Sequence, residues 1–413
     1  MSVAVSMTTS PSLVDTLRDA AGRSAASGEP DAVALAELRA SGLLGTAVPV
    51  AYGGAGGDAT DINRVVARVA EVNPSVAIIL FQHFAVSARI DEWGTPAQKA
   101  ALLPALASGR LLAASAWSET GAGAAKKKLG TTGTRLDDGR WLLDGAKSFT
   151  TSAGIADIYL VLVQTAEAED DLSGPPVSGL TSTEAPARNE PGVSARRRED
   201  TGDRPANAER SEAMSQPSSY GSAGQSFFLV RGENPGIVPD LGLDLLGMRG
   251  SATGFVSLRE CVVDDADRLG PLGEAPAIIA GVRETGATLG AVSVGIARAA
   301  LDLALAHAAR LTPEARTNLR HRLVKISTLA EAAEALVDRA GQRISAAPGI
   351  TTLQSKLHAS TVAEQVCVEV ARMLGSAGYV VAHRLNRLTA DARAVALMGP
   401  TNELCRELVA GSW

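Results

Sequence analysis

The stretch SETGAG occupies residues 118–123 and contains two glycines separated by a single alanine. Glycine has no side chain to keep another group away from the backbone. Backbone N–H groups in such a turn can approach the edge of a flat ring or a thioester oxygen. Glycine-rich turns also join ordinary strands, so two interpretations stay open at this point, a binding turn and a plain strand connection.

The residues before this stretch have the pattern of helices. Apolar residues recur at helical spacing from residue 13 onward. Thr60 and Asp61 are expected to cap a helix that continues through residue 69. Thr95, followed by proline, marks the start of another helix that ends before Gly109. We therefore predict an all-helical domain over residues 1–110.

From residue 111 the pattern changes to short runs rich in β-forming residues, with turn residues between them. The runs expected to be strands are residues 141–143, 158–163, 227–230 and 254–258. They predict an antiparallel β-domain over residues 111–270. Long helical stretches return at 284–310 and 321–346, which predicts a four-helix bundle over residues 271–413.

Residues 165–225 interrupt the β-domain with a segment dense in Ser, Pro, Gly, Glu and Arg. Such a composition buries too little apolar surface to form a core, so we expect a mobile loop. Two interpretations remain, a tolerated surface insertion and a lid or partner-docking segment.

Composition excludes several classes of function. The chain has 413 residues, is 46% hydrophobic and has a formal net charge of -6, which favours neither nucleic acid nor an anionic membrane as a partner. No run is expected to have the ~18 to 20 apolar residues of a membrane span, and the N-terminus lacks the pattern of a signal peptide. We therefore expect a cytoplasmic protein. Its cysteines, Cys261, Cys367 and Cys405, lack metal-site spacing and are expected to be core thiols, with no metal bound.

A second informative stretch, MGPTNE, occupies residues 398–403. Together with residues 118–123 it resembles the flavin-facing turns of the acyl-CoA dehydrogenase superfamily. Further stretches resemble the same family, namely 45–57, 93–109 and 143–151. Each match is short, but their order and spacing along the chain agree. The resemblance implies an α+β fold with an N-terminal helical domain, a central antiparallel β-domain and a C-terminal helical bundle.

The resemblance also implies FAD as cofactor. Ser118 and Thr151 would place hydroxyl groups at the pyrimidine and N5 edges of the flavin, and Phe149 would pack against its ring. Gly375 lies in a turn similar to one that approaches the adenine of a neighbouring subunit, which implies a homodimer or homotetramer. The residues that the resemblance assigns to the cofactor are Trp117, Ser118, Gly123, Phe149, Thr151, Gly375 and Thr401.

The sequence departs from the family in places that matter for chemistry. Residues 124–125 are both alanine, where the family often has Ser-Asp. The family's Arg-x-x-Phe-Gly motif, whose arginine contacts the FAD pyrophosphate, has no match after Arg310. Gly399 occupies the position where the family commonly has its catalytic glutamate. A glycine there cannot accept a proton.

Another carboxylate must then act as the base in a dehydrogenase. The segment from residue 283 to 301 resembles the isovaleryl-CoA dehydrogenase branch, in which the base lies on a neighbouring helix, and it places Glu284 in that role. The alternative is that Glu284 only complements a helix dipole in a first turn. Glu403 is a second candidate, but it lies one helical turn beyond Gly399 and is expected to face solvent.

Three functions remain open from the sequence. The first is an FAD-dependent dehydrogenase of an acyl-CoA or acyl-carrier-protein thioester, re-oxidised by an electron-transfer flavoprotein or by oxygen. The second is a flavin monooxygenase of the same fold, in which His83 hydrogen-bonds a peroxyflavin, although His83 also fits a core position. The third is a homologue that has lost its activity and serves assembly.

Overall fold

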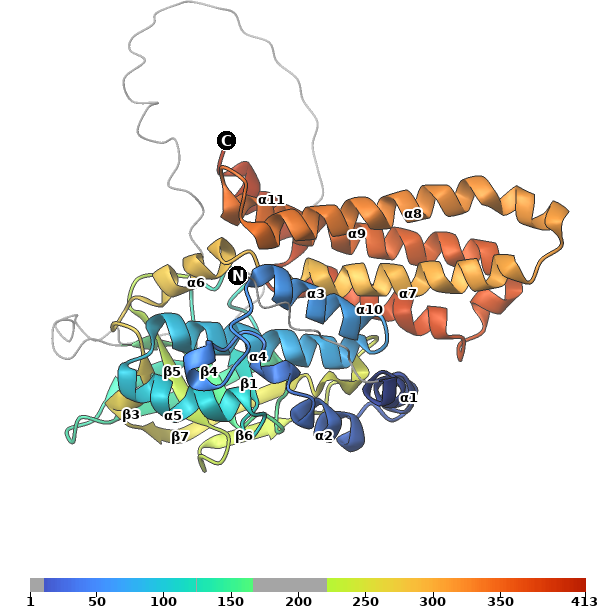
Figure 1. Cartoon of the computed structure of the whole chain (residues 1–413). Coiled ribbons are helices and arrows are strands. Elements are labelled where there is room, and N and C mark those ends of the chain that lie inside the picture. The colour runs from blue at the N-terminus through green and yellow to red at the C-terminus, as the bar shows by residue number, and fades with distance from the viewer. Residues whose placement is uncertain (1–10, 124, 166–220) are drawn as a thin grey trace, which may run out of the picture. The chain divides into compact units, whose positions relative to one another are not determined.

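The computed structural model describes residues 11–123, 125–165 and 221–413. Figure 1 shows these residues as helices, then strands, then helices again along the chain. The predicted insertion at 165–225 lies almost wholly outside the described residues. The division of the chain into domains at residues 110 and 270 stays a prediction.

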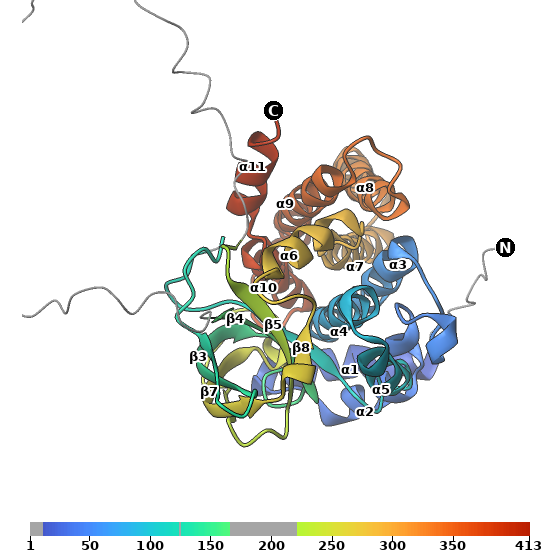
Figure 2. The same cartoon turned by 90° about the vertical axis from the view of Figure 1, so that its left-hand side faces the viewer.

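The N-terminal part is helical, as predicted. Its elements are α1 (Pro11–Ser27), α2 (Ala32–Ala40), η1 (Leu43–Gly45), η2 (Val50–Tyr52), α3 (Ala59–Ala70), α4 (Pro74–Trp93) and α5 (Pro96–Ala107). α4 packs against both α3 and the strand β1, so it lies between the helices and the sheet (Figure 2).

Of the two capping predictions for these helices, one is confirmed and one is wrong. Thr95 caps α5, because its hydroxyl accepts a hydrogen bond from Gln98 N, and this prediction is confirmed. The caps proposed for α3 are wrong by two to three residues, since Asp58 accepts from the N–H groups of Thr60 and Asp61. Asp61 Oδ2 accepts a hydrogen bond from Asp58 N and completes a capping box.

The strands form one sheet in the order β6-β7-β3-β2-β4-β5-β8, and β1 also pairs with β4. The predicted strand runs fall within β3, β4, β5 and β7. The strands are β1 (Ala113–Ala116), β2 (Thr132–Arg135), β3 (Trp141–Thr150), β4 (Ile158–Thr165), β5 (Gln225–Arg231), β6 (Ile237–Asp240), β7 (Gly254–Val263) and β8 (Arg268–Leu269). Most neighbours are antiparallel, but β4 is parallel to β1 and to β2, so the sheet is mixed rather than purely antiparallel.

The C-terminal part contains α6 (Ala275–Glu284), α7 (Gly290–Ala309), α8 (Pro313–Gln342), α9 (Pro348–Leu374), η5 (Gly375–Tyr379), α10 (Arg384–Leu397) and α11 (Asn402–Ala410). α7, α8 and α9 pack against one another, and α10 packs against α7 and α9. The predicted helical stretch over 284–310 is confirmed from Gly290 to Ala309, but residues 285–289 are not helical, because the chain leaves helical geometry at Gly286, whose φ is +85°. Only glycine adopts such an angle at low cost.

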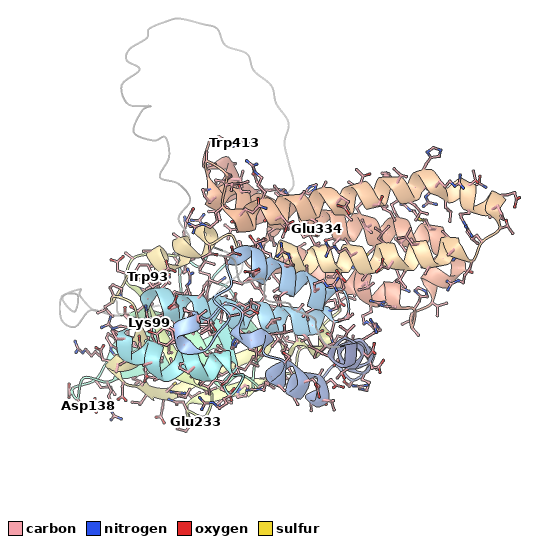
Figure 3. All side chains as sticks on the ribbon, viewed as in Figure 1. Trp93, Lys99, Asp138, Glu233, Glu334 and Trp413 are labelled. Atoms are coloured by element: carbon pink, nitrogen blue, oxygen red, sulfur yellow. The ribbon has the colours of Figure 1, made fainter. Side chains whose placement is uncertain are left out.

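α7 has the length and apolarity of a membrane span, contrary to the expectation from sequence. Most of it is buried inside the protein, where it contacts α3, α8, α9 and α10. The apolar residues of α7 are therefore explained by its position as a core helix. Arg298 on α7 is partly buried and pairs with Glu71, which follows α3, and with Glu334 on α8, which Figure 3 labels.

Gly295 sets how closely α7 approaches α3. A Cβ atom there would lie 2.3 Å from Ala67 O and 2.6 Å from the Ala70 Cβ. Gly295→Ala is expected to lower the free energy of unfolding by about 1–3 kcal/mol, since both obstacles belong to a packed helix. Chemical denaturation measures the change. Gly281→Ala is the matched control, because its nearest neighbours lie 3.6 Å away, and it should leave stability unchanged or slightly higher.

Candidate active site

The loop after β1 exposes backbone at both glycines of the SETGAG stretch. Ser118 O accepts a hydrogen bond from Ser148 N at 2.8 Å, which joins the loop to the end of β3. Gly121 and Gly123 have φ angles of +92° and +69°, and a Cβ at either position would meet nothing within 4 Å. Another group therefore has room to lie against this backbone.

Phe149 lies beside this loop, and both its exposure and its backbone conformation are unusual for a large apolar residue. Its side chain is 63% exposed at the end of a strand, and its φ is +51°. A positive φ is strained for an aromatic residue and is common at functional sites. The neighbouring Thr150 hydroxyl is buried without a partner among the described residues. The structure thus holds an aromatic face outward at a conformational cost.

The hydroxyl of Thr151 is part of a short polar chain. Its Oγ1 lies 3.2 Å from Thr253 Oγ1, which lies 2.7 Å from Ser251 Oγ. These contacts fix the Thr151 side chain on the same strand end as Phe149. Trp117 packs on Phe227 with ring centroids 5.0 Å apart, while its Nε1 is buried without a partner among the described residues.

A buried ion pair joins the loop to β3. Lys147 Nζ lies 2.5 Å from Glu119 Oε1, and the two side chains are 0% and 7% exposed. Glu119 also accepts from Gly130 N at 2.6 Å and from Thr131 N at 3.2 Å. Burial lowers the pKa of Lys147 to about 8 even beside the carboxylate. Burial opposes ionisation of Glu119, but Lys147 and the hydrogen bonds keep its pKa below the usual value.

Lys147→Met is expected to lower the free energy of unfolding by about 3–5 kcal/mol, because it removes the cation that bonds the buried Glu119. Urea denaturation measures the loss. The double variant Lys147→Met/Glu119→Leu should recover most of it, since both charges are gone. Asp138, which Figure 3 labels at the β2–β3 turn, forms an exposed pair with Arg140, so Arg140→Met is the control and should change little. Equal losses in both lysine variants would contradict the expectation.

The turn between α10 and α11 approaches this loop. Ala125 packs against an apolar cluster formed by residues of α9 and α11, namely Leu353, Leu404, Cys405, Leu408 and Val409. Thr401 is the N-cap of α11, where its Oγ1 accepts from Leu404 N at 3.2 Å. The structure therefore brings α11, which follows residues 398–401, close to the loop residue that follows the 118–123 stretch.

Glu284 lies near the N-terminal end of α9. It is the last residue of α6 and is exposed, so it is not in the first turn of a helix as the alternative supposed. Its Oε2 accepts from Gly349 N at 3.2 Å, in the first turn of α9. Glu403 is exposed and pairs with Arg406, which agrees with the expectation that it faces solvent.

Gly375 does not join this group within one chain. It follows the last residue of α9, a helix of 27 residues that begins at Pro348. At 1.5 Å per residue, the two ends of α9 are about 40 Å apart. Tyr379 and Val381, which follow Gly375 closely, are each 92% exposed.

His83 is a core residue. It is fully buried, and its Nδ1 accepts a hydrogen bond from Ala113 N at 3.2 Å at the start of β1. Burial lowers its pKa to about 4, so the ring is neutral. Ser118 lies five residues beyond Ala113, about 16 Å along an extended strand. This geometry fits the core interpretation and gives no support to a flavin contact.

Two residues important to this region were missed from the sequence, Lys147 and Lys356. Lys356 is buried in α9 and bonds the turn that contains Thr401. The sequence signal that could have identified Lys356 is a lysine on the apolar face of a predicted helix. Cys261, Cys367 and Cys405 are buried free thiols, as predicted. The described residues contain no cluster of three or more His, Cys, Asp or Glu side chains able to hold a metal ion.

Comparisons with known proteins agree with this architecture. The N-terminal, middle and C-terminal domain models of acyl-CoA dehydrogenase match residues 13–110, 114–215 and 277–412. An acyl-CoA dehydrogenase of Bacillus subtilis is 27% identical over 377 residues, which are 89% of this chain and 86% of the relative. A dibenzothiophene monooxygenase of Mycolicibacterium goodii is 38% identical over 144 residues, which are 35% of this chain and 33% of that protein.

The fold is similar to that of butyryl-CoA dehydrogenase from Megasphaera elsdenii. The TM-score is 0.78 at 24% identity, with 97% of this chain and 95% of the other covered. The fold predicted from the sequence is therefore confirmed. Domain models of one family match most of the chain in the family's order. The chain belongs to the acyl-CoA dehydrogenase family.

Proposed function

We propose that the protein is an FAD-dependent dehydrogenase of an acyl-CoA or acyl-carrier-protein thioester. The observation that carries the proposal is the exposed Phe149 ring, held at a positive φ beside the open glycines of the 118–123 loop. A flat aromatic group would cover this ring and account for its strained placement. Family membership makes a flavin the expected group.

The residues present fit such a cofactor. Trp117, Ser118, Gly123, Phe149, Thr151 and Thr401 would contact the flavin from one subunit. The Trp117 Nε1 and the Thr150 hydroxyl, which neighbour these residues, are buried without partners among the described residues. Structural relatives of this fold bind FMN, and the absent Arg-x-x-Phe-Gly motif makes weak FAD binding the expected result.

In this proposal Glu284 accepts the α-proton of the thioester. The flavin, when bound, accepts the β-hydride at N5. The hydrogen bond from Gly349 N holds one oxygen of Glu284, and the exposed carboxylate retains further lone pairs for the proton. An electron-transfer flavoprotein or oxygen would re-oxidise the flavin, and the protein would act in the cytoplasm.

The experiment is a titration of the purified protein with FAD and with FMN, followed by anaerobic addition of short-chain acyl-CoA. Saturable quenching of flavin fluorescence and bleaching near about 450 nm are expected. Absence of any saturable flavin binding would reject the flavoenzyme and leave a homologue kept for assembly.

A flavin monooxygenase is the second candidate. Two observations favour it, the local match to the dibenzothiophene monooxygenase and the glycine at residue 399. A protein that binds flavin but is not bleached by any acyl thioester, and that consumes oxygen when its flavin is reduced, would belong to this class.

We also propose a homodimer or homotetramer. Gly375 lies at the C-terminal end of α9, and the family resemblance implies that its turn approaches the cofactor of a neighbouring subunit. The exposed Tyr379, Val380 and Val381 beside it would be covered by such an interface. Light scattering at micromolar concentration is expected to report a dimer or tetramer, and a monomer would contradict this.

A further inference from the structure

A buried lysine on α9 binds the turn between α10 and α11. Lys356 is 3% exposed, and its Nζ donates to Ala396 O and Met398 O at 3.3 Å each and to Asn402 Oδ1 at 2.8 Å. These acceptors use all three N–H groups of the ammonium. One helical turn further along α9, Ser360 Oγ accepts from Asn402 Nδ2 at 3.0 Å.

These contacts join the end of one helix to the start of the next. The last carbonyl groups of an α-helix lack partners within the helix, and a cation near them is favourable. α10 has no basic residue in its own last turn, so Lys356 supplies that cation from α9. Asn402 is the first residue of α11. One side chain therefore fixes both ends of the turn at residues 398–402.

Burying the Lys356 ammonium costs free energy, and a gain in stability does not explain why this position holds a lysine. Burial lowers the pKa of Lys356 to about 8. The acceptors that the structure records for it are neutral oxygens rather than a carboxylate. An apolar side chain of similar length would fill the same space without a buried charge. What the ammonium adds is a defined position for the turn.

We propose that Lys356 is a positioning residue that fixes the turn at residues 398–402, and with it the hydroxyl of Thr401, against the bound flavin. The inference rests on the proposed function, because the contact between Thr401 and the flavin belongs to that proposal. Thr401 Oγ1 accepts from Leu404 N, so its own hydrogen remains available to donate. The direction in which it donates depends on where Lys356 holds the turn.

The test compares Lys356→Met with Lys325→Met, which removes an exposed lysine from α8 and is the matched control. Lys356→Met is expected to weaken flavin binding by about 10-fold, the size of one lost hydrogen bond, because the Thr401 hydroxyl is no longer held against the flavin. The control should bind flavin like the unmodified protein. In a Thr401→Val background Lys356→Met should add little further loss, because the lysine acts through that hydroxyl.

Hydrogen exchange gives a readout that needs no cofactor. The amides of residues 401–405 should exchange faster in Lys356→Met, while those of α7 should not change. If Lys356→Met does not fold, Asn402→Ala removes the shortest of the three contacts and receives the same measurements. Unchanged flavin affinity and unchanged exchange in the folded variant would overturn the inference. An unmodified protein that binds no flavin defeats the proposed function, whereas the exchange experiment still reports whether Lys356 fixes the turn.

Discussion

Replacing Glu284 with glutamine is expected to slow acyl-thioester-dependent flavin reduction by about 10²- to 10⁴-fold, the usual loss when a general base is removed. Glutamine keeps the shape of the side chain and an oxygen that can accept the hydrogen bond from Gly349 N. The start of α9 should therefore remain capped, and flavin affinity should not change. Anaerobic stopped-flow absorbance with a short-chain acyl-CoA measures the rate.

Glu403→Gln is the matched control for this variant. Glu403 is also exposed, but it pairs with Arg406 on its own helix and lies beyond Gly399 in α11. Its replacement should leave the rate within a few-fold of the unmodified protein. Full acyl-CoA-dependent flavin reduction in Glu284→Gln would show that this residue is not the base. A monooxygenase would likewise tolerate the change, because it removes no proton from carbon.

Thermal unfolding separates the two roles available to Glu284. If the residue serves only to cap α9, Glu284→Ala should lower stability by about 0.5–2 kcal/mol and Glu284→Gln should have little effect on either stability or rate. If it is the base, Glu284→Gln should lose rate while its unfolding curve stays in place. The pair of variants therefore distinguishes a structural contact from a chemical one.

Much of the fold follows from local signals in the sequence. The strands at 158–163 and 227–230 are almost wholly buried runs, which the composition revealed directly. Thr95 with its following proline marked the start of α5. Where the prediction failed, a competing local signal was present. Gly286 interrupts the expected helical stretch over 284–310, and Asp58 replaces Thr60 as the cap of α3 because it binds two N–H groups.

The candidate site depended on contacts that no local pattern contains. Ser118 and Ser148 are thirty positions apart and meet only because β1 and β3 lie together in the sheet. Lys356 reaches Asn402 across a gap of 46 positions. Its charge suggested a solvated residue, since lysine is rarely buried. Only the placement of the α10–α11 turn over α9 shows what it binds.

Gly399→Glu is the second variant with a large expected effect. A Cβ at Gly399 would meet nothing within 4 Å, so the turn has room for a longer side chain. Its φ is not among the positive values that favour glycine. A glutamate there would stand close to Thr401 in the chain, at the position to which the family resemblance assigns a carboxylate. The turn should tolerate the substitution without loss of stability.

The most informative test introduces Gly399→Glu into the Glu284→Gln variant, in which the proposed base is already absent. Gly399→Glu is expected to raise the rate of flavin reduction at least about 10²-fold in that background, because it returns a proton acceptor to the site. Gly399→Gln has the same size without a carboxylate and should restore nothing. Rescue by glutamate alone would establish that the missing element is a base. A glutamate that is tolerated, with flavin still bound, but restores no rate would count against α-proton abstraction at this turn, and oxygen consumption by the reduced protein would then be measured.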